Sequence, residues 1–224
     1  YRLIALAPAS VQEMADFVGL AFELAFKYRN PAIILADGVI GQMMEKVVLP
    51  AQKPRRTDAE VIEQCPWATT GRTHHRTPNI ITSLELDPAE MEKRNIHLQK
   101  KYAEIEENEV RFEELHCEDA EYLIVAFGSC ARIAQKAMEM AREEGIKVGL
   151  LRPITLWPFP SKAIAARAAQ VKGILTVELN AGQMVEDVRL AVKCKVPVEH
   201  FGRLGGIVPD PDEVITALKE KLIK

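Results

Sequence analysis

Residues 122–160 constrain the fold more than any other stretch, because together they form one complete strand–helix–strand pattern. The continuous apolar run over residues 122–127 is typical of a strand buried on both faces of a parallel sheet. Ser129 is placed to cap the following helix, and Gly145 lies where that helix is expected to end. A second strand is expected over residues 147–152. Parallel strands joined by a helix connect right-handedly in almost every protein, so the sequence predicts an α/β domain.

The same alternation continues to the end of the chain. Helices are expected over residues 161–171, 183–192 and 210–222, and strands over residues 173–179 and 197–201. This alternation predicts a compact domain with a mostly parallel sheet and flanking helices over residues 118–224.

The first 50 residues carry a shorter piece of the same pattern, with strands expected over residues 2–7 and 32–36. Asp37 and Gly38 follow the second strand, and ligands gather at such strand ends in open α/β sheets. These two residues are therefore the candidate cofactor-binding residues, with a plain turn as the alternative. So short a unit cannot cover both faces of its sheet. We therefore expect a fragment that starts within a larger sheet domain.

The middle of the chain is a proline-rich connection followed by one long helix, which Asp87 and Pro88 begin. The charge-rich residues 104–118 are expected to form the solvated face of this helix. His74 and His75 could attract a metal, but adjacent histidines seldom chelate one ion, so no metal site is predicted.

Composition excludes several function classes. A net charge of −3 over 224 residues gives no support for a nucleic-acid partner. No apolar run approaches the roughly 18 residues of a membrane span, so no membrane partner is expected and a cytoplasmic protein is predicted. The four cysteines are widely spaced without a CxxC pair, and are expected to be reduced structural thiols (Cys65, Cys117, Cys130 and Cys194).

No complete catalytic motif is present. The turn at Gly128 has one glycine where a dinucleotide-binding loop needs three, and no phosphate-binding GK[ST] occurs. Without a GxSxG motif, Ser129 is not expected to be a nucleophile. Glu178 and Asn180 lie at a strand end and could line a site, with a surface or interface role as the alternative. We therefore name no catalytic residue.

Three stretches resemble the α subunit of 2-oxoacid:ferredoxin oxidoreductases. They are RLIALAPASVQEMADFVGLAFELAFKYRNPAIILADGVIGQMMEKVVLP, GSCARIAQKAMEMAREEGIKVGLLRPITLWPFP and ILTVELNAGQMVEDVRLAV. The combination of RPITLWPFP with VELNAGQM is specific, and the resemblance covers nearly the whole chain. The segment NIITSLELDPAEMEKRN is more similar to the 2-ketoisovalerate type than to the 2-oxoglutarate type.

The resemblance implies a division into three parts. Residues 1–52 look like the last part of a thiamine pyrimidine-binding domain. Residues 53–117 are then a linker with the long helix, and residues 118–224 look like a transketolase C-terminal-like domain, called domain II.

The family reaction converts a 2-oxoacid and coenzyme A to acyl-CoA and CO2 while reducing ferredoxin. The resemblance implies thiamine diphosphate, Mg²⁺ and [4Fe-4S] clusters, mainly on a partner β subunit, with a γ subunit and ferredoxin as further partners. The family's residues for the aminopyrimidine ring and the 2-oxoacid lie upstream of Tyr1. We therefore expect no cofactor bound to this chain, which alone should be structural, oligomer-forming and inactive.

Two other interpretations stay open. One is a subunit of another thiamine enzyme, of the transketolase or 2-oxoacid dehydrogenase β type, because domain II alone hardly separates these classes. The other is a noncatalytic α/β module that binds an anion at Ser129, since a helix N-terminus attracts negative charge.

Overall fold

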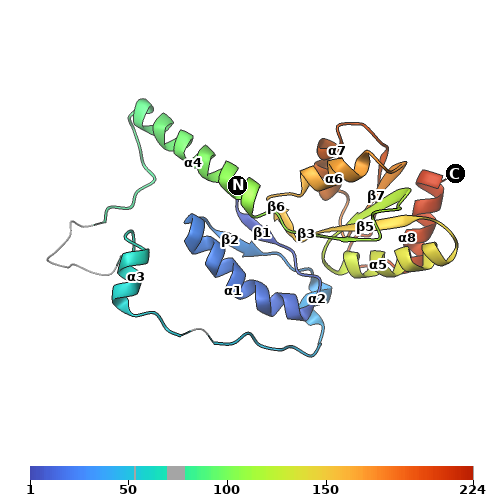
Figure 1. Cartoon of the computed structure of the whole chain (residues 1–224), viewed down its shortest axis with the longest axis horizontal. Helices are drawn as coiled ribbons and strands as arrows, with labels where there is room; N and C mark the ends of the chain where they lie inside the picture. The colour runs from blue at the N-terminus through green and yellow to red at the C-terminus, as the bar shows by residue number, and fades with distance from the viewer. Residues whose placement is uncertain (53, 70–78, 224) are drawn as a thin grey trace. The chain divides into compact units, whose positions relative to one another are not determined.

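The computed structural model of the chain describes residues 1–52, 54–69 and 79–223 (Figure 1). The chain forms two compact units, one of Tyr1–Leu49 with Lys101–Lys224 and the other of Pro50–Lys100. His74 and His75, considered above as metal ligands, lie outside the described residues. In the part of the chain that is described, no helix is both long and apolar enough to span a membrane.

A five-stranded sheet dominates the first unit, in the order β3-β5-β4-β7-β8. Its strands are β3 (Phe112–Leu115), β4 (Tyr122–Ala126), β5 (Val148–Pro153), β7 (Gly173–Glu178) and β8 (Val198–Gly202). β4 pairs in parallel with β5 and β7, and β7 pairs in parallel with β8. β3 runs antiparallel to β5, so the sheet is mixed. The prediction of an α/β domain is confirmed.

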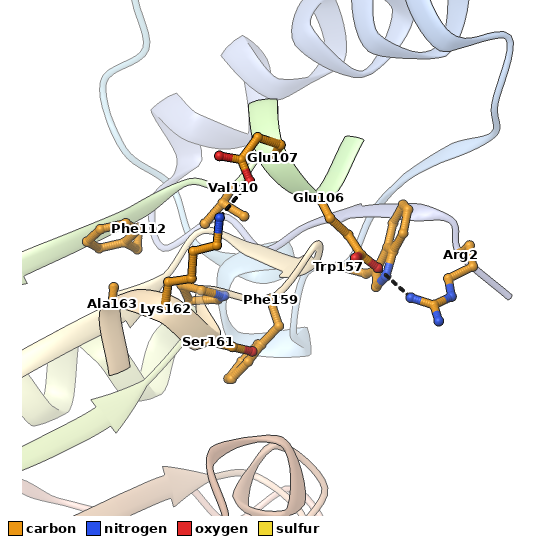
Figure 2. Close-up of a pocket in the computed structure, with 11 residues that line it drawn as sticks. Arg2, Glu106, Glu107, Val110, Phe112, Trp157, Phe159, Ser161, Lys162 and Ala163 are labelled. Atoms are coloured by element: carbon orange, nitrogen blue, oxygen red, sulfur yellow. Dashed lines mark hydrogen bonds and ion pairs between the residues drawn. The ribbon is translucent and has the colours of Figure 1, made fainter. Parts of the chain in front are cut away.

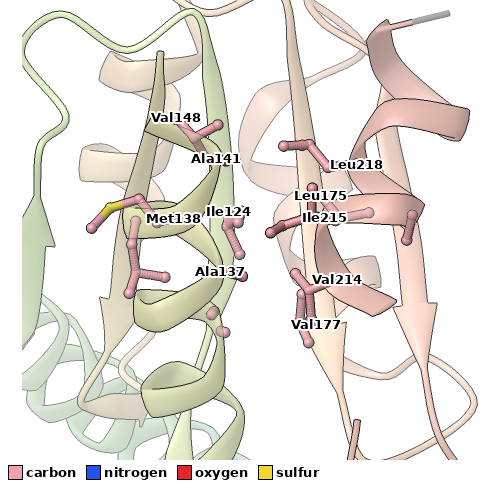
Figure 3. Close-up of a cluster of buried hydrophobic side chains, with 14 of the residues drawn as sticks. Ile124, Ala137, Met138, Ala141, Val148, Leu175, Val177, Val214, Ile215 and Leu218 are labelled. Atoms are coloured by element: carbon pink, nitrogen blue, oxygen red, sulfur yellow. The ribbon is translucent and has the colours of Figure 1, made fainter. Parts of the chain in front are cut away.

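Helices cover both faces of this sheet. They are α5 (Gly128–Glu143), α6 (Ser161–Ala168), α7 (Met184–Val192) and α8 (Pro211–Leu218), and the π-helix η1 (Lys219–Ile223) follows. α5 and α8 pack on one face, where Met138 and Leu218 meet Ile124 and Leu175 of the central strands (Figure 3). α6 and α7 pack on the other face. Burial on both faces explains why most positions of the central strands are apolar.

A second sheet lies in the same unit, in the order β2-β1-β6. Its strands are β1 (Ile4–Leu6), β2 (Ala32–Ile34) and β6 (Thr155–Trp157), and helix α1 (Val11–Tyr28) lies between β1 and β2 in sequence. β1 is parallel to β2 and antiparallel to β6. Because β6 comes from the RPITLWPFP segment, the C-terminal part of the chain completes the N-terminal sheet. Ile4, Leu24, Tyr28 and Ile105 form the core of this region.

The long helix α4 (Pro88–Asn108) begins as predicted, since Asp87 Oδ1 accepts from the backbone N of Ala89 at 2.8 Å. The prediction that residues 104–118 form its solvated face is wrong beyond Asn108. There the chain forms β3, and the acidic side chains of this strand meet arginines. Glu114 pairs with Arg167 at 2.6 Å, so part of this charge run makes ion pairs instead of facing water.

Two short helices were not predicted. They are α2 (Gly38–Gln42) in the first unit and α3 (Asp58–Gln64) in the second. α3 begins with a capping box, in which Thr57 and Glu60 satisfy each other's backbone N–H groups. Both helices are shorter than the three-turn average, so they carry little periodic signal.

Candidate functional site

A pocket of about 210 Å³ lies where strands of the two sheets end. Its lining comes from the last residue of β7 and from residues that follow β2, β4 and β7: Leu35, Ala36, Asp37, Phe127, Cys130, Glu178, Leu179, Asn180 and Gln183. In the five-stranded sheet the chain moves from β4 outward to β5 and then back to β7 on the other side. The pocket is thus at the topological switch point, where open α/β sheets hold ligands at their carboxyl ends. We call it the switch-point pocket.

Asp37 is the polar centre of this pocket. Its Oδ1 accepts from the backbone N of Val39 and of Ile40, both at 3.0 Å, and so caps α2. Its Oδ2 accepts from the backbone N of Ser129 at 2.8 Å, in the first turn of α5. One carboxylate therefore serves two helix N-termini, and Gly38 is the exposed first residue of α2. The prediction that Asp37 or Gly38 binds a cofactor stays a prediction.

The first turn of α5 differs from the expected one. The helix begins at Gly128 with Phe127 as N-cap, so the prediction that the Ser129 side chain caps it is wrong. Ser129 Oγ is buried without a hydrogen-bond partner among the described residues. Gly128 has φ +61°, and a Cβ there would lie 2.6 Å from Asp37 Oδ2. Gly128, which was compared above with phosphate-binding loops, therefore leaves space for the Asp37 carboxylate of the same chain.

Glu178, which the sequence placed at a strand end, is fully buried and accepts three backbone N–H groups. They belong to Gln183 at 3.2 Å, Met184 at 2.8 Å and Val185 at 3.0 Å, which begin α7. His200 Nδ1 lies 3.4 Å from Glu178 Oε1. Glu178 and Asn180 do line the same pocket as Asp37, as sequence reasoning allowed. The contacts of Glu178 are those of a residue that anchors a helix N-terminus.

Cys130 is a poor nucleophile in this setting. Burial raises the pKa of its thiol to about 12, and the carboxylates of Asp37 and Glu178 add to this rise. Only the thiolate is strongly nucleophilic, so the side chain stays protonated near neutral pH.

A metal ion bound to a diphosphate needs oxygen ligands that are free to coordinate it. Among the described residues, no group of three His, Cys, Asp or Glu side chains could hold a metal ion. The two carboxylates of the switch-point pocket already accept backbone N–H groups of this chain. The described residues therefore do not fit the Mg²⁺–diphosphate part of thiamine diphosphate.

A larger pocket of about 690 Å³ lies between the end of α4 and the connection from β6 to α6 (Figure 2). Its walls are mainly apolar and aromatic, formed by Val110, Phe112, Trp157, Phe159, Pro160 and Ala163. Two exposed ion pairs stand at its rim, Arg2 with Glu106 at 2.5 Å and Lys162 with Glu107 at 2.6 Å. Sequence reasoning missed this pocket. Its one signal was the aromatic pair in LWPFP, whose neighbours come from distant segments.

Residues 1–116 match the family described as pyruvate flavodoxin/ferredoxin oxidoreductase, thiamine diP-binding. Residues 120–214 match pyruvate:ferredoxin oxidoreductase core domain II.

Two curated relatives come from Methanothermobacter marburgensis. Its ketoisovalerate oxidoreductase subunit VorB is 47% identical over 98% of this chain and 60% of the relative. Its 2-oxoglutarate synthase subunit KorA is 30% identical over 97% of this chain and 64% of the relative. The chain thus spans about 60% of the length of these relatives.

A solved structure shares the fold. The 2-oxoglutarate:ferredoxin oxidoreductase from Magnetococcus marinus superposes with a TM-score of 0.74 over 97% of this chain and 42% of that chain. The sequence identity is 22%, so this likeness concerns the fold alone.

Proposed function

The chain belongs to the pyruvate flavodoxin/ferredoxin oxidoreductase family, and from this membership we propose that it is part of an α-type subunit of a ketoisovalerate-type oxidoreductase. The proposed reaction is oxidative decarboxylation of a branched 2-oxoacid to its acyl-CoA, with reduction of ferredoxin. The observation that carries the substrate class is the 47% identity to a ketoisovalerate oxidoreductase subunit, against 30% to a 2-oxoglutarate synthase subunit.

In this proposal the Mg²⁺–diphosphate site and the [4Fe-4S] clusters belong to a partner β subunit, with a γ subunit and ferredoxin completing the cytoplasmic enzyme. The hydrogen bonds that the pocket carboxylates accept support this division of the sites between subunits. Asp37 and Glu178 stand at the strand ends where a cofactor group would be sought, and each accepts backbone N–H groups of this chain. In this proposal the chain has a structural role and forms contacts with other subunits of an oligomer.

We further propose that residues 1–52 are the last part of a pyrimidine-binding domain, residues 53–117 a linker with a long helix, and residues 118–224 domain II. The strand pairing supports a close union of the first and last parts, because β6 of the last part pairs with β1 of the first.

The test is an activity measurement on the enzyme isolated from its producing cells through an affinity tag on this chain. Coenzyme A-dependent reduction of methyl viologen is followed with ketoisovalerate, 2-oxoglutarate and pyruvate. We expect the highest kcat/KM for ketoisovalerate and no reduction by the recombinant chain alone. A higher kcat/KM for 2-oxoglutarate would refute the substrate class, and decarboxylation by the chain alone would refute the division of labour.

A further inference from the structure

The switch-point pocket of domain II is lined in part by residues of the N-terminal segment, which is residues 1–52. Residues Leu35, Ala36 and Asp37, which follow β2 of the N-terminal sheet, line it together with residues that follow β4 and β7. In an open α/β sheet of this order, the crevice beside the central strand ends is where a separate ligand binds.

The first turn of α5 favours an anion in this crevice, which the buried Glu178 carboxylate also lines. α5 is a 16-residue helix, and the backbone N–H of Ser129 in its first turn donates to the pocket residue Asp37 at 2.8 Å. A helix N-terminus carries partial positive charge and stabilises a negative group. Gly128 leaves the space in which Asp37 Oδ2 sits, and the buried Ser129 Oγ, in the same turn, has no partner among the described residues.

We propose that Asp37 is the resident anion of this crevice, so that the crevice joins the N-terminal segment to domain II instead of binding an exchangeable ligand. Asp37 is a positioning residue in this proposal, and it acts through the first turns of α2 and α5. The inference rests on this geometry and does not depend on the proposed enzymatic activity.

Other contacts across the same junction have the same polarity. Glu45 of the N-terminal segment pairs with Arg132 of α5 at 2.6 Å, and Glu13 of α1 pairs with Arg152 of β5 at 2.6 Å. Each carboxylate lies on the N-terminal segment and each donor on domain II. Asp37 differs from the other two because its donor on domain II is a backbone N–H group and not an arginine side chain.

The test removes the resident anion and offers a free one. Asp37→Ala removes the carboxylate from the crevice. Urea unfolding of the variant is then measured in about 100 mM acetate or phosphate, and the midpoint is compared with that in NaCl of equal ionic strength. We expect the midpoint of the variant to fall in NaCl. Acetate should restore at least half of that loss, saturably, while the wild type does not respond.

Asp210→Ala is the matched control. Asp210 also caps a helix, α8, by accepting from the backbone N of Glu213 at 2.9 Å, but it is exposed. We expect this variant to lose stability without any acetate-specific recovery. Equal recovery of both variants, or no recovery of Asp37→Ala beyond that in NaCl, overturns the proposal.

Asp37→Ala could also fail to fold in NaCl, in which case refolding in acetate is compared by near-UV circular dichroism. Native ellipticity in acetate alone supports the proposal. If the variant folds in neither salt, Asp37→Asn decides, because its amide fills the crevice without the charge. The proposal then requires that the unfolding midpoint of Asp37→Asn lies below that of the wild type and does not change when acetate is added. A midpoint equal to that of the wild type overturns the proposal.

Discussion

Arg152 Nη2 donates to both carboxylate oxygens of Glu13, each at 2.6 Å, and so ties β5 to the first turn of α1. The Arg152 side chain is 11% exposed and also reaches Glu113 Oε2 at 3.1 Å. Glu13 Oε2 in turn accepts from the backbone N of Ala9 at 2.7 Å. One buried guanidinium therefore connects the strand β5, the edge strand β3 and the start of α1.

Arg152→Met should lower the free energy of unfolding by about 3 kcal/mol, because Glu13 is left partly buried without its cation. Urea unfolding followed by circular dichroism measures this loss. Lys162→Met is the control, since its ion pair with Glu107 is exposed at the rim of the larger pocket and should contribute little. Similar midpoint shifts for the two variants would contradict the expected role of burial.

Glu109 is a buried carboxylate on which three side chains converge. Lys27 Nζ at 2.7 Å and Tyr28 Oη at 2.6 Å donate to Oε1, and Arg111 Nη1 at 2.9 Å donates to Oε2. Burial pushes the pKa of Glu109 upward, but the hydrogen bonds from these three side chains outweigh it and hold the pKa below the ordinary 4.5. The folded state therefore prefers the charged carboxylate.

Glu109→Gln should cost about 2 kcal/mol of unfolding free energy at about pH 7, because the three donors lose a charged acceptor. A lowered folded-state pKa stabilises the protein fully above 4.5, and this stability is lost as the pH falls through the folded value. The difference between wild type and variant should therefore shrink as the pH drops from 4.5. Urea unfolding measured at several pH values from 4.5 downward tests this expectation, with the exposed Glu90→Gln as the control variant. A stability difference between wild type and Glu109→Gln that does not change with pH would contradict the lowered pKa of Glu109.

Gly128→Ala should be more destabilising than Gly145→Ala. Both glycines have positive φ, which costs a non-glycine residue about 1–2 kcal/mol, but nothing lies within 4 Å of a Cβ at Gly145. At Gly128 the new Cβ also meets Asp37 Oδ2. The double variant Asp37→Ala with Gly128→Ala should therefore cost less than the sum of the single changes in urea unfolding. Strict additivity would show that the two residues do not interact.

Iodoacetamide should modify Cys194 alone in the native protein at about pH 8, because the thiolate is the reactive form and only this cysteine is exposed. Cys65, Cys117 and Cys130 are buried. Burial raises the pKa of Cys117 to about 11 and that of Cys130 to about 12. Peptide mass spectrometry after labelling measures the sites, and Cys194→Ser should abolish native labelling. Labelling of Cys130 at a comparable rate would be inconsistent with this structure.

Elements with a strong local signal were predictable. β4 is a continuous apolar run, β5 and β7 are mostly apolar, and α4 and α8 begin at Asp-Pro pairs that cap and start a helix. β3 was missed because its charged residues resemble a solvated helix face until their arginine partners are known. β6 was missed because three residues between prolines acquire strand geometry only by pairing with β1.

The candidate site divides in the same way. Asp37, Gly38, Glu178 and Asn180 could be named from sequence, because each lies at or just after the end of a predicted strand. The role of Ser129 could not be predicted, since its backbone N–H meets a carboxylate 92 residues away. A cap residue is recognised by its neighbours in sequence, and here the capping group is supplied by a different segment.

The amino-acid sequence by itself determined the α/β class, the order of the main elements and the strand ends at which polar residues gather, because hydrophobic periodicity and capping are local properties of a chain. Only the tertiary structure decided that β6 completes the N-terminal sheet and that the Asp37 carboxylate accepts a hydrogen bond from the first turn of α5. Hydrogen bonds and ion pairs between distant segments depend on where the packed core brings their atoms. Local pattern does not encode that placement.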